Sequence, residues 1–89
     1  MEDIKKVFLL AVKDFLEKKI SIQEFSAICE YLTFNGEIWW LRDIEEKDKS
    51  LGKAMYAGAE LIFNYKEKTG YYKELFQEII NYYKKQKVN

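Results

Sequence analysis

The chain has no histidine and a single cysteine, Cys29, among its 89 residues. Without histidine there is no Ser-His or Cys-His nucleophile and no histidine-ligated zinc or haem. One cysteine cannot form an internal disulfide bond or a thiolate metal cage, and it favours a reducing, cytoplasmic location. A glycine-rich phosphate loop is also missing. These absences predict a protein that is not an enzyme and that holds no metal ion or cofactor.

Proline is absent and glycine occurs only four times, which excludes collagen, flexible linkers and loop-rich scaffolds. No apolar run approaches the roughly 20 residues that a membrane-spanning helix needs. Met1 is followed by Glu2 and Asp3, where a secretory signal would carry basic residues, so we expect no signal peptide. With 48% apolar residues the chain can bury a modest core. Its length predicts a single domain over residues 1–89.

Charge is balanced overall but unevenly distributed. Fifteen basic and fifteen acidic residues cancel, so the composition does not indicate a nucleic-acid-binding protein. Residues 20–49 carry seven acidic and three basic side chains, whereas residues 50–89 carry seven lysines and four glutamates. A solvated surface explains most gradients of this kind, and an acidic patch that faces a cationic partner is the alternative.

Apolar residues recur at helical spacing in four segments, and no strand-like alternation occurs. The stripes run from Ile4 to Phe15, from Ile22 to Leu32, from Leu51 to Tyr65 and from Tyr72 to Tyr83. Short connections between four helices predict an all-α, single-domain, antiparallel four-helix bundle. Further leucines widen the first stripe and predict that its helix is central and contacts two neighbours: Leu9, Leu10 and Leu16.

Three positions carry sharper local predictions. Ser21 and Glu24 have the spacing of a capping box, in which each side chain accepts a hydrogen bond from the backbone amide of the other residue. We therefore expect the second helix to begin after Ser21. Gly58 lies inside the third stripe, and because glycine costs about 1 kcal/mol relative to alanine in a helix, it predicts the close approach of another backbone. Cys29 is expected to be a small buried hydrophobe.

Residues 37–50 have no clean periodicity, and we expect a short helical turn followed by a loop. The alternative is that the charged residues 42–49 form the first turns of the next helix. Two adjacent tryptophans stand among many carboxylates in residues 37–50. Tryptophan is enriched at interface hot spots, and carboxylates attract a cationic surface. The alternatives are tryptophans that cover the end of the bundle and a solvated acidic loop; the spacing fits no calcium-binding EF-hand. With one glutamate from the third helix, the candidate partner-binding residues are Glu37, Trp39, Trp40, Asp43, Glu45, Glu46, Asp48 and Glu60.

Short strings around the expected start of the second helix carry a resemblance to a known family. They are Phe15-Leu16, Lys19-Ile20-Ser21, Glu24-Phe25-Ser26 and Ile28-Cys29, with a further string at Gly58-Ala59-Glu60-Leu61. They resemble the colicin D immunity protein family of bacterial self-protective, colicin-like immunity proteins. Total length also agrees. Residues 33–52 look longer than the corresponding connection in the family, and the link from Lys68 to Tyr71 looks shorter, so only Glu60 is carried over as a site residue.

The resemblance implies a four-helix bundle that forms a 1:1 complex with the nuclease domain of a cognate bacterial toxin and inhibits it. In the family the target is a tRNA-cleaving ribonuclease, and acidic side chains occupy its cationic substrate cleft. We accordingly expect a cytoplasmic protein that is monomeric when free and contacts neither nucleic acid nor membrane. Two sources of the toxin remain open: a secreted colicin and a contact-dependent growth inhibition system.

The alternative hypothesis is a small structural or regulatory helical module that self-associates through its slim third helix. A less favoured third hypothesis uses the lysines of the last helix to bind nucleic acid. The placement of the acids and tryptophans distinguishes the first two hypotheses. One shared face would indicate inhibition, whereas dispersal around the bundle with an apolar patch elsewhere would indicate assembly.

Overall fold

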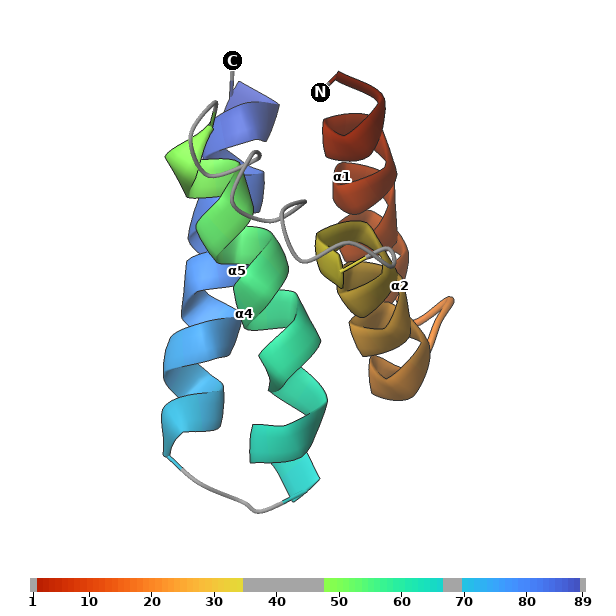
Figure 1. Ribbon diagram of the computed structural model, residues 1–89, viewed down its shortest axis with the longest axis vertical. Coiled ribbons are helices and arrows are strands. Elements are labelled where there is room, and N and C mark those ends of the chain that lie inside the picture. The colour runs from red at the N-terminus through yellow and green to blue at the C-terminus, as the bar shows by residue number, and fades with distance from the viewer. Residues whose placement is uncertain (1, 35–47, 67–69, 89) are drawn as a thin grey trace.

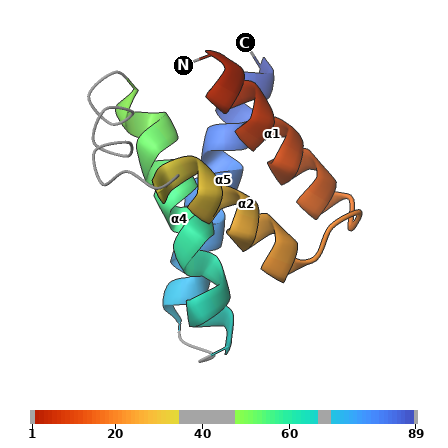
Figure 2. The same cartoon turned by 45° about the vertical axis from the view of Figure 1, so that its right-hand side comes forward.

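The structure, a computed structural model, describes residues 2–34, 48–66 and 70–88. These residues form four α-helices and no strand: α1 (Glu2–Leu16), α2 (Ile22–Phe34), α4 (Lys49–Lys66) and α5 (Tyr71–Val88). Along the long axis of Figure 1 the chain descends in α1 and α4 and ascends in α2 and α5. The start of α1 and the end of α5 therefore lie at the same end, as Figure 2 also shows. The prediction of an all-α bundle of four helices is confirmed.

The helix at the centre of the described fold is α4, which packs extensively against both α2 and α5. The first helix, α1, has a smaller interface with α2 and a slight one with α5. The prediction that the first helix contacts two neighbours is therefore confirmed, whereas the prediction that it is central is wrong. Small residues on α4 let two neighbours approach its backbone, whereas Leu10 and Leu16 on α1 remain exposed to solvent.

Aromatic rings from α1, α2 and α5 form much of the core. Phe25 of α2 stacks on Phe15 at 4.7 Å between ring centroids, and Phe8 lies 6.4 Å from Phe25 and 5.9 Å from Tyr82. Tyr83, which the fourth stripe predicts on the core side, is half-buried and packs against the core, whereas its neighbour Tyr82 is buried. The buried hydrophobic residues are Phe8, Ala11, Val12, Phe25, Cys29, Leu32, Leu51, Ala54, Met55, Ala57, Ala59, Leu61, Leu75, Ile79 and Tyr82.

The turn between α1 and α2 is fixed at both ends by backbone hydrogen bonds. The amide of Lys18 donates to the Phe15 carbonyl at 3.1 Å and that of Lys19 to the Asp14 carbonyl at 2.8 Å. These two bonds form a Schellman motif, with Lys18 in the left-handed conformation at a φ of 62°. The start of α2 is fixed by the residue that follows this turn, Ser21.

The capping box at Ser21 is confirmed. The amide of Glu24 donates to the Ser21 Oγ at 3.1 Å, and the amide of Ser21 donates to the Glu24 Oε1 at 3.0 Å. Two of the amides that a helix start leaves without an intrahelical partner are thus satisfied reciprocally. The first residue of α2 is Ile22, as the sequence predicts.

Gly58 lies where α4 crosses α2, which confirms the prediction of a close helix approach. A Cβ atom added there would collide with the Cys29 Sγ and would lie 3.3 Å from the Phe25 ring. The Ser26 hydroxyl donates to the Gly58 carbonyl at 2.9 Å across the same crossing. The missing side chain of Gly58 is therefore what lets α2 and α4 approach and share a buried hydrogen bond.

The third stripe, however, does not stay on the core side along its whole length. Tyr65 is more than half exposed and contacts Tyr72 of α5 at 5.3 Å between ring centroids.

No helix in the described ranges is both long and apolar enough to cross a membrane.

Candidate functional site

Two of the predicted partner-binding residues, Asp48 and Glu60, lie within the described residues. The others fall in the range 35–47, outside them: Glu37, Trp39, Trp40, Asp43, Glu45 and Glu46. The expected turn and loop of residues 37–50 also lies largely outside the described residues. Asp48 and Glu60 are therefore the acids whose surroundings the structure defines.

Asp48 is the N-cap residue of α4. Its Oδ1 accepts a hydrogen bond from the Leu51 amide at 3.1 Å, and its backbone carbonyl accepts one from the Gly52 amide at 3.0 Å. A carboxylate at this position also interacts favourably with the positive end of the helix dipole. Asp48 thus has a structural role at the start of α4. Because the residue is half-buried, only part of its surface is available to a partner.

Glu60 belongs to a small polar cluster on the outer side of α4. Its negative charge raises the pKa of Tyr56, and a hydrogen bond from the Tyr56 hydroxyl to the Glu60 carboxylate acts in the same direction. The charge of Tyr71, on α5, contributes a smaller effect at the same hydroxyl. On the C-terminal side, the Asn64 amide donates to the Glu60 carbonyl at 3.0 Å. The Glu60 carboxylate therefore acts on Tyr56, one turn earlier on the same helix, while the backbone of Glu60 is bonded to the Asn64 side chain.

The structure does not bring Asp48 and Glu60 into one cluster. They are twelve positions apart along α4, which corresponds to about 18 Å along a helix axis. A single cationic group cannot reach both carboxylates. Within the described residues, the two acids can only act together on an extended surface.

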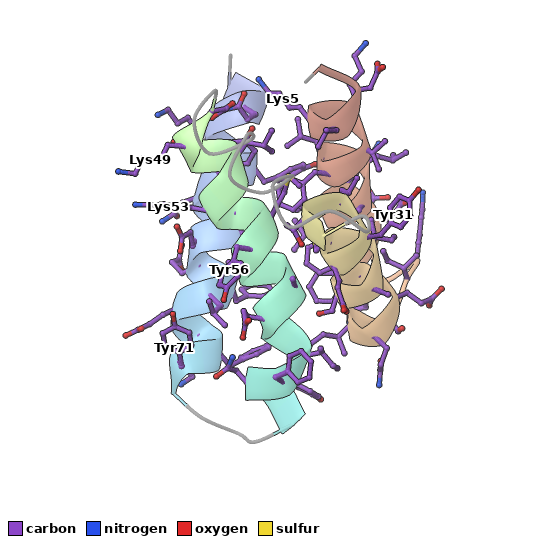
Figure 3. The ribbon with its side chains drawn as sticks, in the orientation of Figure 1. Lys5, Tyr31, Lys49, Lys53, Tyr56 and Tyr71 are labelled. Carbon is purple, nitrogen blue, oxygen red and sulfur yellow. The ribbon has the colours of Figure 1, made fainter. Side chains whose placement is uncertain are left out.

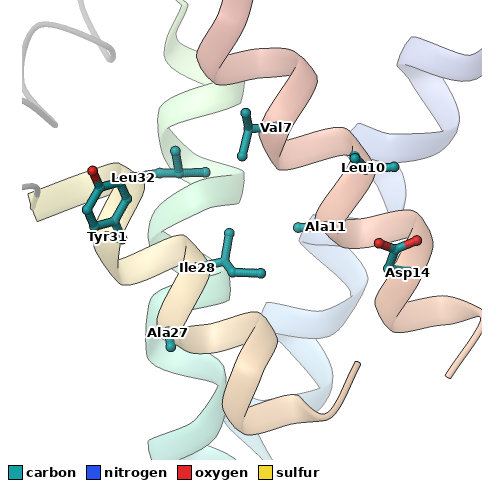
Figure 4. Close-up of a pocket in the computed structure, with 8 residues that line it drawn as sticks. All are labelled: Val7, Leu10, Ala11, Asp14, Ala27, Ile28, Tyr31 and Leu32. Atoms are coloured by element: carbon teal, nitrogen blue, oxygen red, sulfur yellow. The ribbon is translucent and has the colours of Figure 1, made fainter. Parts of the chain in front are cut away.

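An apolar groove between α1 and α2 is a feature that the sequence-based prediction missed. It has a volume of about 520 Å³ and, as Figure 4 shows, four residues from each helix line it. They are Val7, Leu10, Ala11, Asp14, Ala27, Ile28, Tyr31 and Leu32. Large apolar side chains at its rim are strongly exposed, with Leu10 at 59% and Tyr31 at 66%. Asp14 is the one charged residue in this lining.

The sequence did contain a signal for this groove. Leu10 widened the first apolar stripe beyond the arc that one packed face requires, and it was assigned to a second helix contact. In the structure α1 does contact a second helix, α5, through Phe8 and Phe15, but Leu10 takes no part in this contact and remains exposed. Exposed apolar side chains that gather around a groove are typical of protein-binding surfaces.

The single cysteine of the chain, Cys29, is buried in the core. Burial raises the pKa of the Cys29 thiol well above its ordinary range, so the thiolate is disfavoured. This agrees with the prediction that Cys29 is a buried hydrophobe, and its exposed fraction is 0%. In residues 2–34, 48–66 and 70–88, no three cysteine or carboxylate side chains gather in a way that could hold a metal ion.

Comparison with known proteins gives no match from which a function could be assigned. No family model, no curated protein and no solved structure matches this chain.

Proposed function

We propose that this chain is an immunity protein that binds the nuclease domain of a cognate bacterial toxin and inhibits it. The target is a tRNA-cleaving ribonuclease whose cationic active-site cleft is blocked by acidic side chains. The observation that carries the proposal is the acidic excess of residues 20–49, in which seven acids and two tryptophans occur against three basic residues. The resemblance of the segment from Phe15 to Cys29 to the colicin D immunity family supports the same function.

The physical chemistry of a ribonuclease explains why such a composition suits an inhibitor. A cleft that binds RNA attracts phosphate groups and is therefore positively charged. Carboxylates on the inhibitor steer the encounter and fix its orientation, while tryptophans exclude water from the charge pairs. Glu60 is partly exposed on α4, beside Tyr56, which supports its assignment to the binding surface.

Co-expression tests the proposal. The chain is produced in bacteria together with the nuclease-like toxin encoded beside it, and cell survival is compared for wild type and variants. We expect the wild type to protect, and reversal of Glu45 and Glu46 to lysine to reduce protection. Reversal of Lys84 and Lys85 to glutamate is the matched control and should leave protection unchanged. A wild-type chain that protects against no neighbouring toxin would contradict the function.

The second candidate function is a helical module that self-associates. The observation that favours it is the apolar groove between α1 and α2, with Leu10 and Tyr31 exposed at its rim. Self-association through the third predicted helix, α4, does not agree with the structure, because its small residues Gly58, Ala54 and Ala57 are buried inside the fold. Self-association would therefore use the outer face of α1 and α2.

Sedimentation velocity distinguishes the two candidates. A self-associating module would sediment as a dimer or larger species as concentration rises, and Leu10→Lys would return it to a monomer. Phe63→Lys is the control, because Phe63 is 60% exposed on α4 and does not line the groove. A wild-type chain that remains monomeric at all concentrations would rule out this second function and agree with the immunity proposal.

A further inference from the structure

The outer side of the α4–α5 pair contains a pocket that the proposed function does not assign. Its volume is about 250 Å³, and it is lined by Lys53, Tyr56, Ala57, Tyr71, Leu75 and Glu78. We call it the tyrosine pocket. Figure 3 labels three of these residues, Lys53 and Tyr56 on α4 and Tyr71 on α5. Small-molecule sites in proteins usually exceed about 300 Å³, so this volume suits a single side chain better than a metabolite.

The aromatic walls of the pocket are accessible. Tyr56 is 43% exposed and Tyr71 is 54% exposed, whereas Leu75 and Ala57 at the base are buried. The face of a tyrosine ring carries partial negative charge and attracts a cation placed over it. The negative charge of Glu60 acts on the Tyr56 hydroxyl and raises its pKa, so a carboxylate stands beside this ring.

Carboxylates also stand beside the rings of the pocket. Glu78 lines it and Glu60 adjoins Tyr56, while the ammonium groups nearby are those of Lys53 in the lining and Lys85 on the far side of Glu78. Within the described part of the chain, neither carboxylate forms an ion pair with a lysine. Lys53 is an exposed side chain, and Figure 3 shows it extending from the edge of α4 toward solvent. Two carboxylates therefore remain available beside two accessible rings.

We propose that the tyrosine pocket binds the guanidinium group of an arginine side chain from a protein partner. The planar guanidinium stacks on a tyrosine ring and donates hydrogen bonds to the carboxylates of Glu78 and Glu60. Arginine fits better than lysine because its head group is planar, more weakly hydrated and able to donate in several directions at once. The proposal rests on the proposed function in one respect, namely that the arginine belongs to the toxin nuclease.

Arginine binding can be measured without the toxin. The full chain is titrated with Nα-acetyl-arginine amide while NMR follows the ring resonances of its tyrosines. We expect saturable shifts at Tyr56 and Tyr71, and smaller shifts with Nα-acetyl-lysine amide. Glu78→Gln should weaken arginine binding several-fold, whereas Glu30→Gln, which alters an exposed acid on α2, should not. Two results would overturn the proposal. One is equal shifts with the arginine and the lysine amide, and the other is equal affinity of the Glu78→Gln and Glu30→Gln variants for the arginine amide.

A second measurement ties the pocket to the partner. Affinity for the toxin nuclease domain is compared between wild type and the variants Tyr71→Leu and Glu78→Gln. Weakening by both variants supports the proposal. Unchanged affinity in both overturns the assignment of the arginine to the toxin, while the immunity function stands. Saturable arginine binding by a chain that binds no toxin would instead refute the immunity function and leave the pocket's chemistry intact.

Discussion

Lys18 holds the end of α1 in a backbone conformation that suits glycine better than lysine. Its φ of 62° places its Cβ close to backbone atoms, an arrangement that costs a non-glycine residue about 1 kcal/mol. Sequence periodicity cannot reveal such a position, because no glycine or asparagine marks it. The left-handed residue follows from the two hydrogen bonds that close the Schellman motif.

We predict that Lys18→Gly stabilises the protein by about 0.5–1 kcal/mol, since glycine adopts a positive φ without steric cost. The free energy of unfolding in urea measures the change. Lys18→Ala is the control, because alanine removes the long side chain but keeps the Cβ, and it should gain nothing comparable. Equal stability of the glycine and alanine variants would show that Lys18 is not strained.

Unlike the conformation of Lys18, the capping role of Ser21 could be predicted from the spacing of residues in the sequence alone. The serine and the glutamate three residues later define a box whose two hydrogen bonds are local, so no tertiary contact is needed to form it. Ser21→Ala should cost about 1 kcal/mol of unfolding free energy. Ser50→Ala, at an exposed serine in the first turn of α4, is the comparison and should change stability by a few tenths at most. An equal effect of both changes would contradict the cap.

Asp48 was predicted as a binding residue, and the structure adds a second role that its charge does not reveal. Because its Oδ1 caps α4, a substitution to alanine would destabilise the helix as well as remove the charge. Asparagine also caps helices well, so Asp48→Asn separates the two roles. Any test of Asp48 in partner binding should therefore use the asparagine variant.

The crossing of α2 and α4 is the element contact that determines how the helices are arranged. Cys29 and Phe25 fill the space that a side chain at position 58 would occupy, and Ser26 bonds to the Gly58 carbonyl. The glycine was recognisable because it stands inside a helical stripe, where alanine would be the better helix former. Its partner helix was not recognisable, since sequence spacing does not say which faces meet.

Gly58→Ala should therefore destabilise the protein by about 1–3 kcal/mol, because the collision at the Cys29 Sγ outweighs the helix propensity gained. Thermal or chemical denaturation gives the difference. Gly70→Ala serves as the reference, since a Cβ at Gly70 meets no atom within 4 Å. A Gly58→Ala variant that is as stable as wild type would show that the two helices do not pack as described.

The position of α1 shows where the sequence was misleading at the level of elements. Its apolar residues cover more than one face, which favoured a central helix with two neighbours. A long apolar arc is equally compatible with a peripheral helix whose outer face borders a binding groove. The two cases differ only in tertiary packing. The small residues of α4 decide between them, because they let both α2 and α5 pack closely on α4.

For the whole molecule, the helical class and the four-element layout followed from periodicity, which depends on each segment alone. The candidate site was less predictable, because it depends on distances between segments. Asp48 and Glu60 lie about 18 Å apart along α4, so they form no single acidic cluster. Tyr56 and Tyr71 meet beside Glu60 only because α4 and α5 pack side by side.

The proposed immunity function requires that the acidic side chains, and not the lysine-rich end, contact the toxin nuclease. The most direct measurement is the dissociation constant of the complex, compared for Glu60→Lys and for the double reversal of Lys84 and Lys85 to glutamate. If Glu60 forms a desolvated charge pair, its reversal should cost about 2–5 kcal/mol of binding free energy, whereas the lysine variant should bind like wild type. Loss of affinity in the lysine variant with Glu60→Lys unaffected would contradict the account.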